Sequence, residues 1–244
     1  MAARHFDPAE PGTPTATWQP LIAGLPSAEP EIGALVLVAP HPDDEVLGLG
    51  ALTAALTDRG VPVTIIAVTD GDASHPGSPT HSPAALAELR RRESVAAAAV
   101  LGVTGIVHLG LPDGAVTDHE DRLAELLAPH LPAGATVAVP FHADGHPDHE
   151  ATARAGSAAA RARGLPVLEY PVWLWHWSHP DDQDIDWARA RRLPATPGCA
   201  ERKRRAAAAF ASQIAPLSPH PADRAVLPAH ILARLLDLEE VVFA

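Results

Sequence analysis

The sequence predicts an α/β fold, a Rossmann-like three-layer arrangement with a mostly parallel β-sheet and a lid-like C-terminal extension. Short apolar runs alternate with stretches in which apolar residues recur at helical spacing. The runs lack polar alternation, which is typical of strands buried on both faces of a parallel sheet. Two of them end at proline and lead into loops rich in His and Asp. In open α/β sheets, ligands bind at such carboxyl ends of strands.

Five strands are expected, at residues 34–39, 61–69, 105–109, 135–139 and 167–175. Helices are expected at residues 46–59, 83–101, 118–128, 151–163 and 199–214. Proline ends the first and fourth strands because it cannot donate a ladder hydrogen bond. Gly60, Gly102 and Gly164 stand where helices would end. Pro83 suits the first turn of the second helix, and Asp118 is a candidate N-cap for the third.

The chain is expected to form one domain over residues 31–244, preceded by an arm. Residues 1–30 are rich in Pro, Ala, Gly and acids, with isolated apolar positions, and therefore predict an irregular N-terminal arm. From about residue 178 the sequence becomes polar and interrupted by proline, before apolar patterns return. Residues 178–244 are accordingly expected to form the lid-like part of the same domain.

Composition excludes several classes of protein. The hydrophobic content of 47% with 20% charged residues is ordinary for a globular chain. A net charge of −12 argues against sequence-independent binding to nucleic acid or to anionic membranes. No apolar run approaches ~18 residues, so neither a signal peptide nor a membrane span is expected. The single cysteine, Cys199, excludes an internal disulfide and favours a reducing, cytoplasmic location.

Two loops carry the residues suited to chemistry. His41, Asp43 and Asp44 follow the first strand, and His146 and His149 follow the fourth. In a parallel sheet both loops emerge at the same edge, so they are expected to converge. His41, Asp44 and His149 then form a set of two imidazoles and one carboxylate, which with an open water position is typical of catalytic zinc. Asp43 and His146 remain as acid/base candidates beside the metal.

These loops carry a family resemblance. The segments APHPDDE (39–45) and GHPDHE (145–150) resemble the signature loops of the PIG-L/LmbE-like zinc N-deacetylases, and weaker similarities extend over roughly residues 33–215. The resemblance implies one Zn²⁺ per chain, held by His41, Asp44 and His149. It also implies that Asp43 is the general base for the attacking water. Protonated His146 would stabilise the oxyanion, and His146 or Asp43 would protonate the leaving amine.

Further positions are assigned around this centre. Asp148 is a candidate for fixing the His146 tautomer, and Arg91 or Arg92 for orienting a substrate hydroxyl or the Asp-rich loops. The Trp-rich run at residues 173–177 suits either core packing along a strand or, because aromatic rings stack well on sugar faces, contact of at least one Trp with substrate. The candidates there are Trp175 and the adjacent His176. His142 is left undecided. The family often has Glu where Asp72 stands and His where Phe210 stands, and both positions bear on the substrate class.

The expected activity is removal of an acetyl or other acyl group from an amino-sugar-type small molecule, with secondary metabolism as one setting. The expected partner is therefore a small N-acyl substrate, with no nucleic acid and no membrane span, and homo-oligomerisation stays open. Two alternatives remain: a metal-dependent amidase on a non-sugar amide such as a thiol conjugate, and a catalytically inactive sugar-binding module. Ligand sets of N and O atoms also accept Fe²⁺, Mn²⁺ or Co²⁺.

Overall fold

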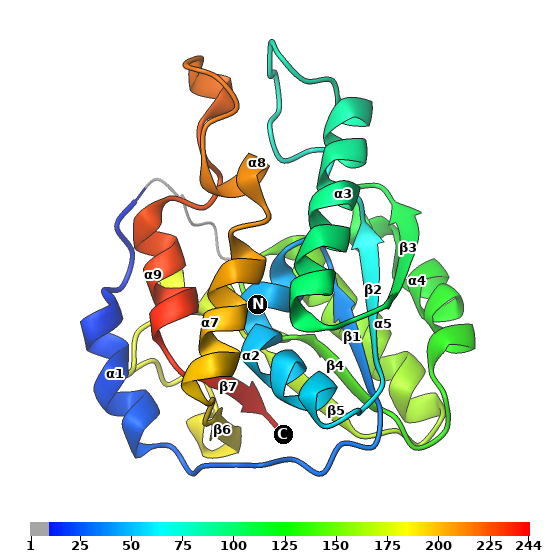
Figure 1. The fold of residues 1–244 in the computed structure, drawn as a ribbon. Helices are drawn as coiled ribbons and strands as arrows, with labels where there is room; N and C mark the ends of the chain where they lie inside the picture. The colour runs from blue at the N-terminus through cyan, green and yellow to red at the C-terminus, as the bar shows by residue number, and fades with distance from the viewer. Residues whose placement is uncertain (1–9) are drawn as a thin grey trace.

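One seven-stranded sheet organises the computed structural model, which describes residues 10–244 (Figure 1). Its strands are β1 (Leu35–Ala39), β2 (Val63–Thr69), β3 (Gly105–Leu111), β4 (Thr136–Pro140), β5 (Val167–Tyr170), β6 (Ala190–Leu193) and β7 (Glu240–Phe243). They lie in the order β3-β2-β1-β4-β5-β7-β6. The first five pair in parallel, and β7 runs antiparallel to both of its neighbours. The mostly parallel sheet is therefore confirmed.

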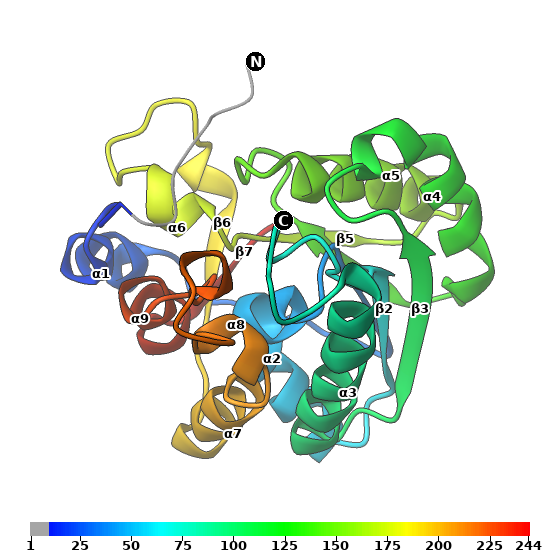
Figure 2. The same cartoon turned by 90° about the horizontal axis from the view of Figure 1, so that it is seen from above.

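Helices cover both faces of the sheet and complete the three expected layers (Figure 2). The α-helices are α1 (Thr15–Gly24), α2 (Asp44–Asp58), α3 (Pro83–Leu101), α4 (Glu120–Leu127), α5 (Pro147–Ala162), α6 (Leu174–Trp177), α7 (Pro197–Ala207), α8 (Ala211–Ile214) and α9 (Ala229–Asp237). Helices α4 and α5 cover one face, while α2, α3 and α7 cover the other. Each face has its own cluster of buried apolar side chains.

Local sequence signals place several helix ends correctly. Helix α3 begins at Pro83, where the Ser82 side chain accepts a hydrogen bond from the Ala85 N–H, and it is followed by Gly102 at φ 79°. The third helix begins later than expected, because Asp118 lies in a 3-10 turn (Val116–His119) and α4 starts at Glu120. The buried Val116 donates its N–H to Asp148, which fixes this tight turn before the helix.

The expected fifth strand ends early. It stops at Tyr170 instead of residue 175, and the tryptophan-rich run after it is the short helix α6. The reason is a carboxylate from another loop, since Asp144 accepts the N–H groups of Val172, Trp173 and Leu174 at 2.9–3.0 Å. These bonds satisfy the donors that open a helical turn, so strand pairing is not needed there.

The irregular N-terminal arm is also corrected where it is described, because residues 15–24 form α1; residues 1–9 lie outside the described chain. Trp18 and Ile22, four residues apart, are both buried. The Trp18 indole packs edge-on against Trp175, with ring centroids 5.0 Å apart, and donates to the Trp175 carbonyl at 2.9 Å. Burial against the domain therefore stabilises this helix, although Pro20 lies in its interior. A proline inside a helix is unfavourable, so the local sequence did not indicate α1.

The C-terminal part is more than a lid. Strands β6 and β7 extend the sheet, and α7 packs on α2 and α3. The expected helix over residues 199–214 is divided at Phe210, which is buried with φ −82° and ψ 56°, into α7 and α8. Only the segment around α8 and residues 215–228 reaches the carboxyl edge of the parallel strands, where Gln213, Val226 and Leu227 line a cavity. In the described chain, no helix combines the length and apolar character that a membrane crossing requires.

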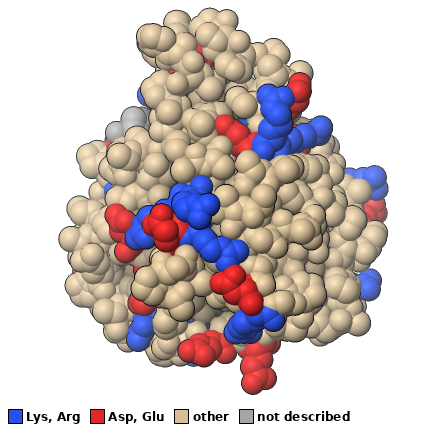
Figure 3. Space-filling view, in the orientation of Figure 1, with Lys and Arg blue, Asp and Glu red and all other residues tan. Residues whose placement is uncertain are grey.

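On the face shown in Figure 3, Lys and Arg side chains are interspersed with Asp and Glu. That face therefore has no continuous basic surface of the kind that binds phosphate backbones.

Candidate metal centre and active site

The two His- and Asp-rich loops meet because their strands are neighbours. Strand β1 pairs with β4 in parallel, with Leu35 opposite Thr136, so both loops leave the same edge of the sheet. The first loop carries His41 and leads into α2, and the second carries His146 and leads into α5. Side chains more than 100 positions apart in the sequence thus lie within one site, as expected from the parallel arrangement.

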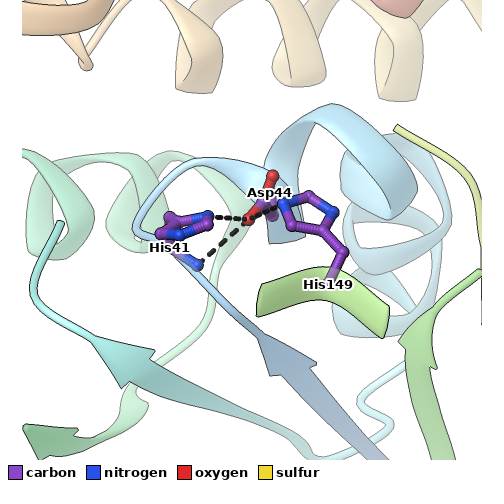
Figure 4. Close-up of side chains that lie close together, drawn as sticks. All are labelled: His41, Asp44 and His149. Atoms are coloured by element: carbon purple, nitrogen blue, oxygen red, sulfur yellow. Dashed lines mark hydrogen bonds and ion pairs between the residues drawn. The ribbon is translucent and has the colours of Figure 1, made fainter. Parts of the chain in front are cut away.

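His41, Asp44 and His149 form a group that could hold a metal ion, with one ligand atom from each lying within 4.8 Å of the others (Figure 4). Asp44 Oδ2 lies between the imidazoles, 3.2 Å from His41 Nδ1 and 3.2 Å from His149 Nε2. For comparison, two ligands of a tetrahedral zinc ion with bonds of about 2.0 Å are about 3.3 Å apart. The spacing of these donors therefore fits a small transition-metal ion.

The surroundings of His149 fit a metal ligand. Its side chain is fully buried, and Nε2 has no hydrogen-bond partner in the described chain even though Asp44 Oδ2 lies nearby. A buried imidazole nitrogen without a partner is costly unless another group occupies its lone pair. A metal ion between His149 and Asp44 would remove that cost.

A second group, formed by His41, His146 and Asp148, overlaps the first. Its members already have structural partners. Asp148 accepts hydrogen bonds from the Gly114 N–H at 2.7 Å and the Val116 N–H at 3.1 Å. His146 Nδ1 accepts the Asp148 N–H at the start of α5. The His41–Asp44–His149 group, which retains an unpartnered nitrogen, is therefore the better candidate.

The electrostatics of this group are those of a buried cation site. Burial alone would raise the pKa of Asp44, but His149 and His41 lower it well below the ordinary range. Burial also opposes a charged His149, yet Asp44 and Asp144 raise its pKa to about 9. Without a metal, then, protons on the imidazoles compensate the carboxylate. A metal ion would displace these protons and take over their role.

Asp144, which the sequence analysis missed, orients His149. Its Oδ2 lies 2.8 Å from His149 Nδ1, and the carboxylate is held by the three N–H groups before α6. A carboxylate accepts only, so Nδ1 of His149 carries a proton, and Nε2 is the nitrogen that would face a metal once its own proton is displaced. The only sequence signal for Asp144 was its position in the second loop. The backbone groups that hold it lie about 28 residues later in the chain, so the local sequence did not indicate them.

The variant Asp144→Asn is expected to weaken metal binding by about 10- to 100-fold. The new amide can donate to Nδ1, which moves the imidazole proton to Nε2 and blocks the metal-facing lone pair. Metal affinity would be measured by competition with a chromophoric chelator, with Asp181→Asn, at an exposed turn, as the control. Wild-type affinity in a folded Asp144→Asn protein would contradict this role.

Asp43 is buried beside the metal group in a strained conformation. It has φ 133° and ψ −31°, the one positive φ at a non-glycine residue in the described chain. Its N–H donates to Glu45 Oε2 at 3.0 Å, and its carbonyl accepts the N–H groups of Val46 and Leu47. Such strain persists only where surrounding contacts impose it, and it is common at functional sites. Burial raises the pKa of Asp43 to about 7, which suits a general base near neutral pH.

The arginine that contacts Asp43 is Arg90, one position before the two arginines that were expected near the site. Arg90 is 3% exposed, and its guanidinium donates to Asp43 Oδ2 at 3.1 Å and to the carbonyls of Pro42 and Gly71. Arg91 instead pairs with Asp70, and Arg92 pairs with Glu88 on the surface. Successive helical residues are rotated by about 100°, and no local pattern identifies which of three consecutive arginines faces inward. A Cβ at Gly71 would lie 2.0 Å from the Arg90 guanidinium, so glycine is required there.

Arg90→Gln is expected to lower kcat by about 10²-fold, because Asp43 loses its positioning partner. The positive charge of Arg90 lowers the pKa of Asp43, so its removal should raise that pKa further above its ordinary value. The acid limb of the kcat/KM profile should therefore move to higher pH. Arg91→Gln is the matched control and should keep the wild-type profile. An unshifted acid limb in Arg90→Gln would exclude this coupling.

His146 lines the cavity beside the metal group. Burial, with additional repulsion from His149 and His41, lowers the pKa of His146 to about 3. Because Nδ1 accepts the Asp148 N–H, the neutral ring carries its proton on Nε2. His146 is therefore set to donate a hydrogen bond as a neutral imidazole.

A cavity of about 470 Å³ opens in front of these groups, and Asp43, His146 and Arg90 line it together with Trp173 and Gln213. Several other expected positions lie outside its walls. Asp72 does not line the cavity, whereas the next two residues, Ala73 and Ser74, do.

The other expected positions have structural partners instead. Trp175 packs on Trp18, and His176 is buried with Nδ1 3.1 Å from Arg234. His142 pairs with Glu169, and Phe210 belongs to the apolar core. Asp148 is fully buried and contacts His41 Nε2 at 3.2 Å in addition to its backbone donors.

Asp113 is a further acid at the site. Its Oδ1 lies 3.1 Å from His41 Nε2, and its Oδ2 accepts the Ala73 N–H at 2.7 Å. Burial opposes ionisation, but His41 lowers the pKa of Asp113 to about 2. The carboxylate therefore stays charged and orients His41, as Asp144 orients His149. The turn Leu111-Pro-Asp-Gly114 was the available sequence signal, although it did not identify the partner.

Fold and site together define an α/β protein with a candidate single-metal centre at the carboxyl edge of a parallel sheet. The PIG-L family model, described as GlcNAc-PI de-N-acetylase, matches residues 36–160. This protein belongs to the PIG-L family.

Relatives and solved structures agree with this assignment. A 1D-myo-inositol 2-acetamido-2-deoxy-alpha-D-glucopyranoside deacetylase of Kineococcus radiotolerans is 30% identical over 67% of this chain and 45% of its own length. A diacetylchitobiose deacetylase of Thermococcus kodakarensis is 29% identical over 56% and 52%. The chain thus spans about half the length of these relatives. A conserved protein of Thermus thermophilus has a similar structure, with 25% identity, a TM-score of 0.59, and coverage of 88% of this chain and 94% of that one.

Proposed function

We propose that this protein is a zinc-dependent hydrolase that removes an acetyl or another acyl group from the amide nitrogen of an amino-sugar-type small molecule. One observation carries the proposal: a buried carboxylate, Asp43, stands beside the His41–Asp44–His149 group inside a cavity. A protein that only binds a sugar would need neither an unpartnered metal-facing imidazole nor a strained acid with a raised pKa.

Membership of the PIG-L family supports amide hydrolysis, and the names of the relatives support an acetylated amino sugar. Zinc is proposed because two imidazoles and one carboxylate are a common ligand set of catalytic zinc. The cytosol is the proposed compartment, since the single cysteine is buried and free.

A bound metal would polarise the amide carbonyl and make a water molecule more acidic. The residues of this chain do the rest. Asp43, which Arg90 holds in place through a hydrogen bond, would take a proton from the attacking water. That water would add to the carbonyl carbon. The Nε2–H of His146 would stabilise the developing oxyanion. As the C–N bond breaks, the proton on Asp43 passes to the leaving amine, so that one water yields a carboxylic acid and a free amine.

The test is deacylation of a panel of purified compounds by metal-loaded protein, with release of amine detected directly. The panel would hold N-acetylglucosamine glycosides, N-acylated thiol conjugates and N-acetyl amino acids. Turnover of the amino sugars above the other amides supports the proposal. Turnover confined to the thiol conjugates or amino acids would instead identify a non-sugar amidase. Metal binding without turnover of any member would indicate an inactive binding module.

A further inference from the structure

We propose that a second cavity beside the catalytic one holds the distal part of an elongated substrate, and that Arg224 there binds an anionic group of that part. The ligand class is a carboxylate or phosphate carried on the leaving-amine side of the substrate. This inference rests on the amide hydrolysis proposed above, and it adds a requirement for negative charge away from the reacting amide.

The second cavity, of about 600 Å³, adjoins the catalytic cavity and shares two wall residues with it. Ser74 and Val226 line both it and the catalytic cavity. Ser74 belongs to loop 70–82, which follows β2, and Val226 belongs to segment 215–228, which follows α8. Both segments project from the same side of the molecule in Figures 1 and 2. The shared residues place the two cavities side by side, and in the proposed binding mode a substrate whose amide faces Asp43 extends past Ser74 and Val226 into the second cavity.

The two projecting segments are bonded to each other. Thr80 Oγ1 donates to Asp223 Oδ2 at 2.8 Å, and the Ser218 hydroxyl donates to the same oxygen. Asp223 is fully buried by these contacts. Its carboxylate therefore serves to join the segments and does not line the second cavity, although it directly precedes Arg224.

The charge of the lining favours an anion. No acidic residue is among those that line the second cavity, whereas Arg224, His75 and His230 are. Arg224 is exposed and forms no ion pair with any carboxylate of residues 10–244. His75 is 4% exposed, its Nδ1 lies 3.0 Å from the Ser74 hydroxyl, and its ring also lies beside the backbone of Arg224. The one hydrogen bond of the His230 side chain within the described residues runs from its Nε2–H to the Glu10 carbonyl, at 3.0 Å. An exposed arginine that makes no ion pair in the described chain, beside a buried imidazole, suits an anionic ligand.

The remaining walls are short and apolar, and they consist of Pro76, Pro221, Ala222, Ala225, Val226 and Pro228. Such a surface makes van der Waals contact with an apolar spacer and offers few competing hydrogen-bond donors. The expected distal part therefore combines an apolar body with a terminal anion, the two features that these walls and Arg224 can recognise.

The test uses two aryl glycosides of N-acetylglucosamine that share one shape, the 4-carboxyphenyl and the 4-carbamoylphenyl compounds. Wild-type protein is expected to show a higher kcat/KM for the carboxylate. Arg224→Gln should lower kcat/KM for the carboxylate about tenfold through KM, and should change the value for the neutral amide less than twofold. The control is Arg59→Gln, at the exposed end of α2, which should leave both values unchanged.

Equal losses for the two glycosides in Arg224→Gln, or no loss for the carboxylate, would overturn the inference. If wild-type protein hydrolyses neither glycoside, the proposed activity on amino sugars fails, and the cavity is tested by calorimetry with 4-carboxyphenyl glucoside, which carries no amide. Binding that Arg224→Gln weakens about tenfold would uphold the anion site. Absence of binding to wild-type protein would remove it.

Discussion

Asp43→Asn is expected to lower kcat by about 10³-fold or more while leaving one metal ion bound per chain. The amide keeps the shape of the side chain and an oxygen that can face Arg90, but it cannot take a proton from water. Because Asp43 is outside the His41–Asp44–His149 group, the metal should remain. The measurement pairs single-substrate kinetics with elemental mass spectrometry on the same preparation.

The control for this variant is Asp72→Asn, at a partly buried acid on loop 70–82 that does not line the cavity. It should retain at least half of the wild-type kcat. Full activity of Asp43→Asn would remove the general-base assignment. Loss of the metal together with activity would show instead that Asp43 supports the metal centre and would leave its proton transfer without evidence.

His149→Ala is expected to abolish metal retention, taking metal content from about one ion per chain to near zero and activity with it. The substitution removes one of three candidate ligands and leaves Asp44 and Asp144 without their imidazole partner. Losing a direct ligand should cost more affinity than the roughly 10- to 100-fold typical of an outer partner. Metal content would be measured after purification without chelator.

His179→Ala is the matched control. Residues 179–182 have the same HPDD sequence as the first loop but lie in a surface turn, where His179 is exposed. It should keep the metal and the activity. Circular dichroism would establish that His149→Ala is folded, since the new cavity lies in a fully buried position. A folded His149→Ala protein with a full complement of metal would show that the ion sits elsewhere, with the His41–His146–Asp148 group as the next candidate.

The sequence by itself determined the mostly parallel character of the sheet and the place where chemistry is concentrated. Both follow from local rules: buried apolar runs end at proline, and parallel strands direct their following loops to one edge. The sequence was therefore sufficient to group His41, Asp44 and His149 as one candidate site. The family resemblance depended on the same two loops, because their residues are contiguous in the chain.

Only the tertiary structure decided the residues that act across the fold. Arg90 faces Asp43 while Arg91 faces Asp70, and this choice depends on how α3 is rotated against the sheet. Asp144 contacts His149 and also accepts backbone N–H groups at the start of α6. Because of these bonds, the end of the expected fifth strand is a helix. Trp18 likewise packs on Trp175 and so attaches helix α1 to the core. Such contacts join residues far apart in the sequence, so their energies are settled by packing and burial that no local pattern records.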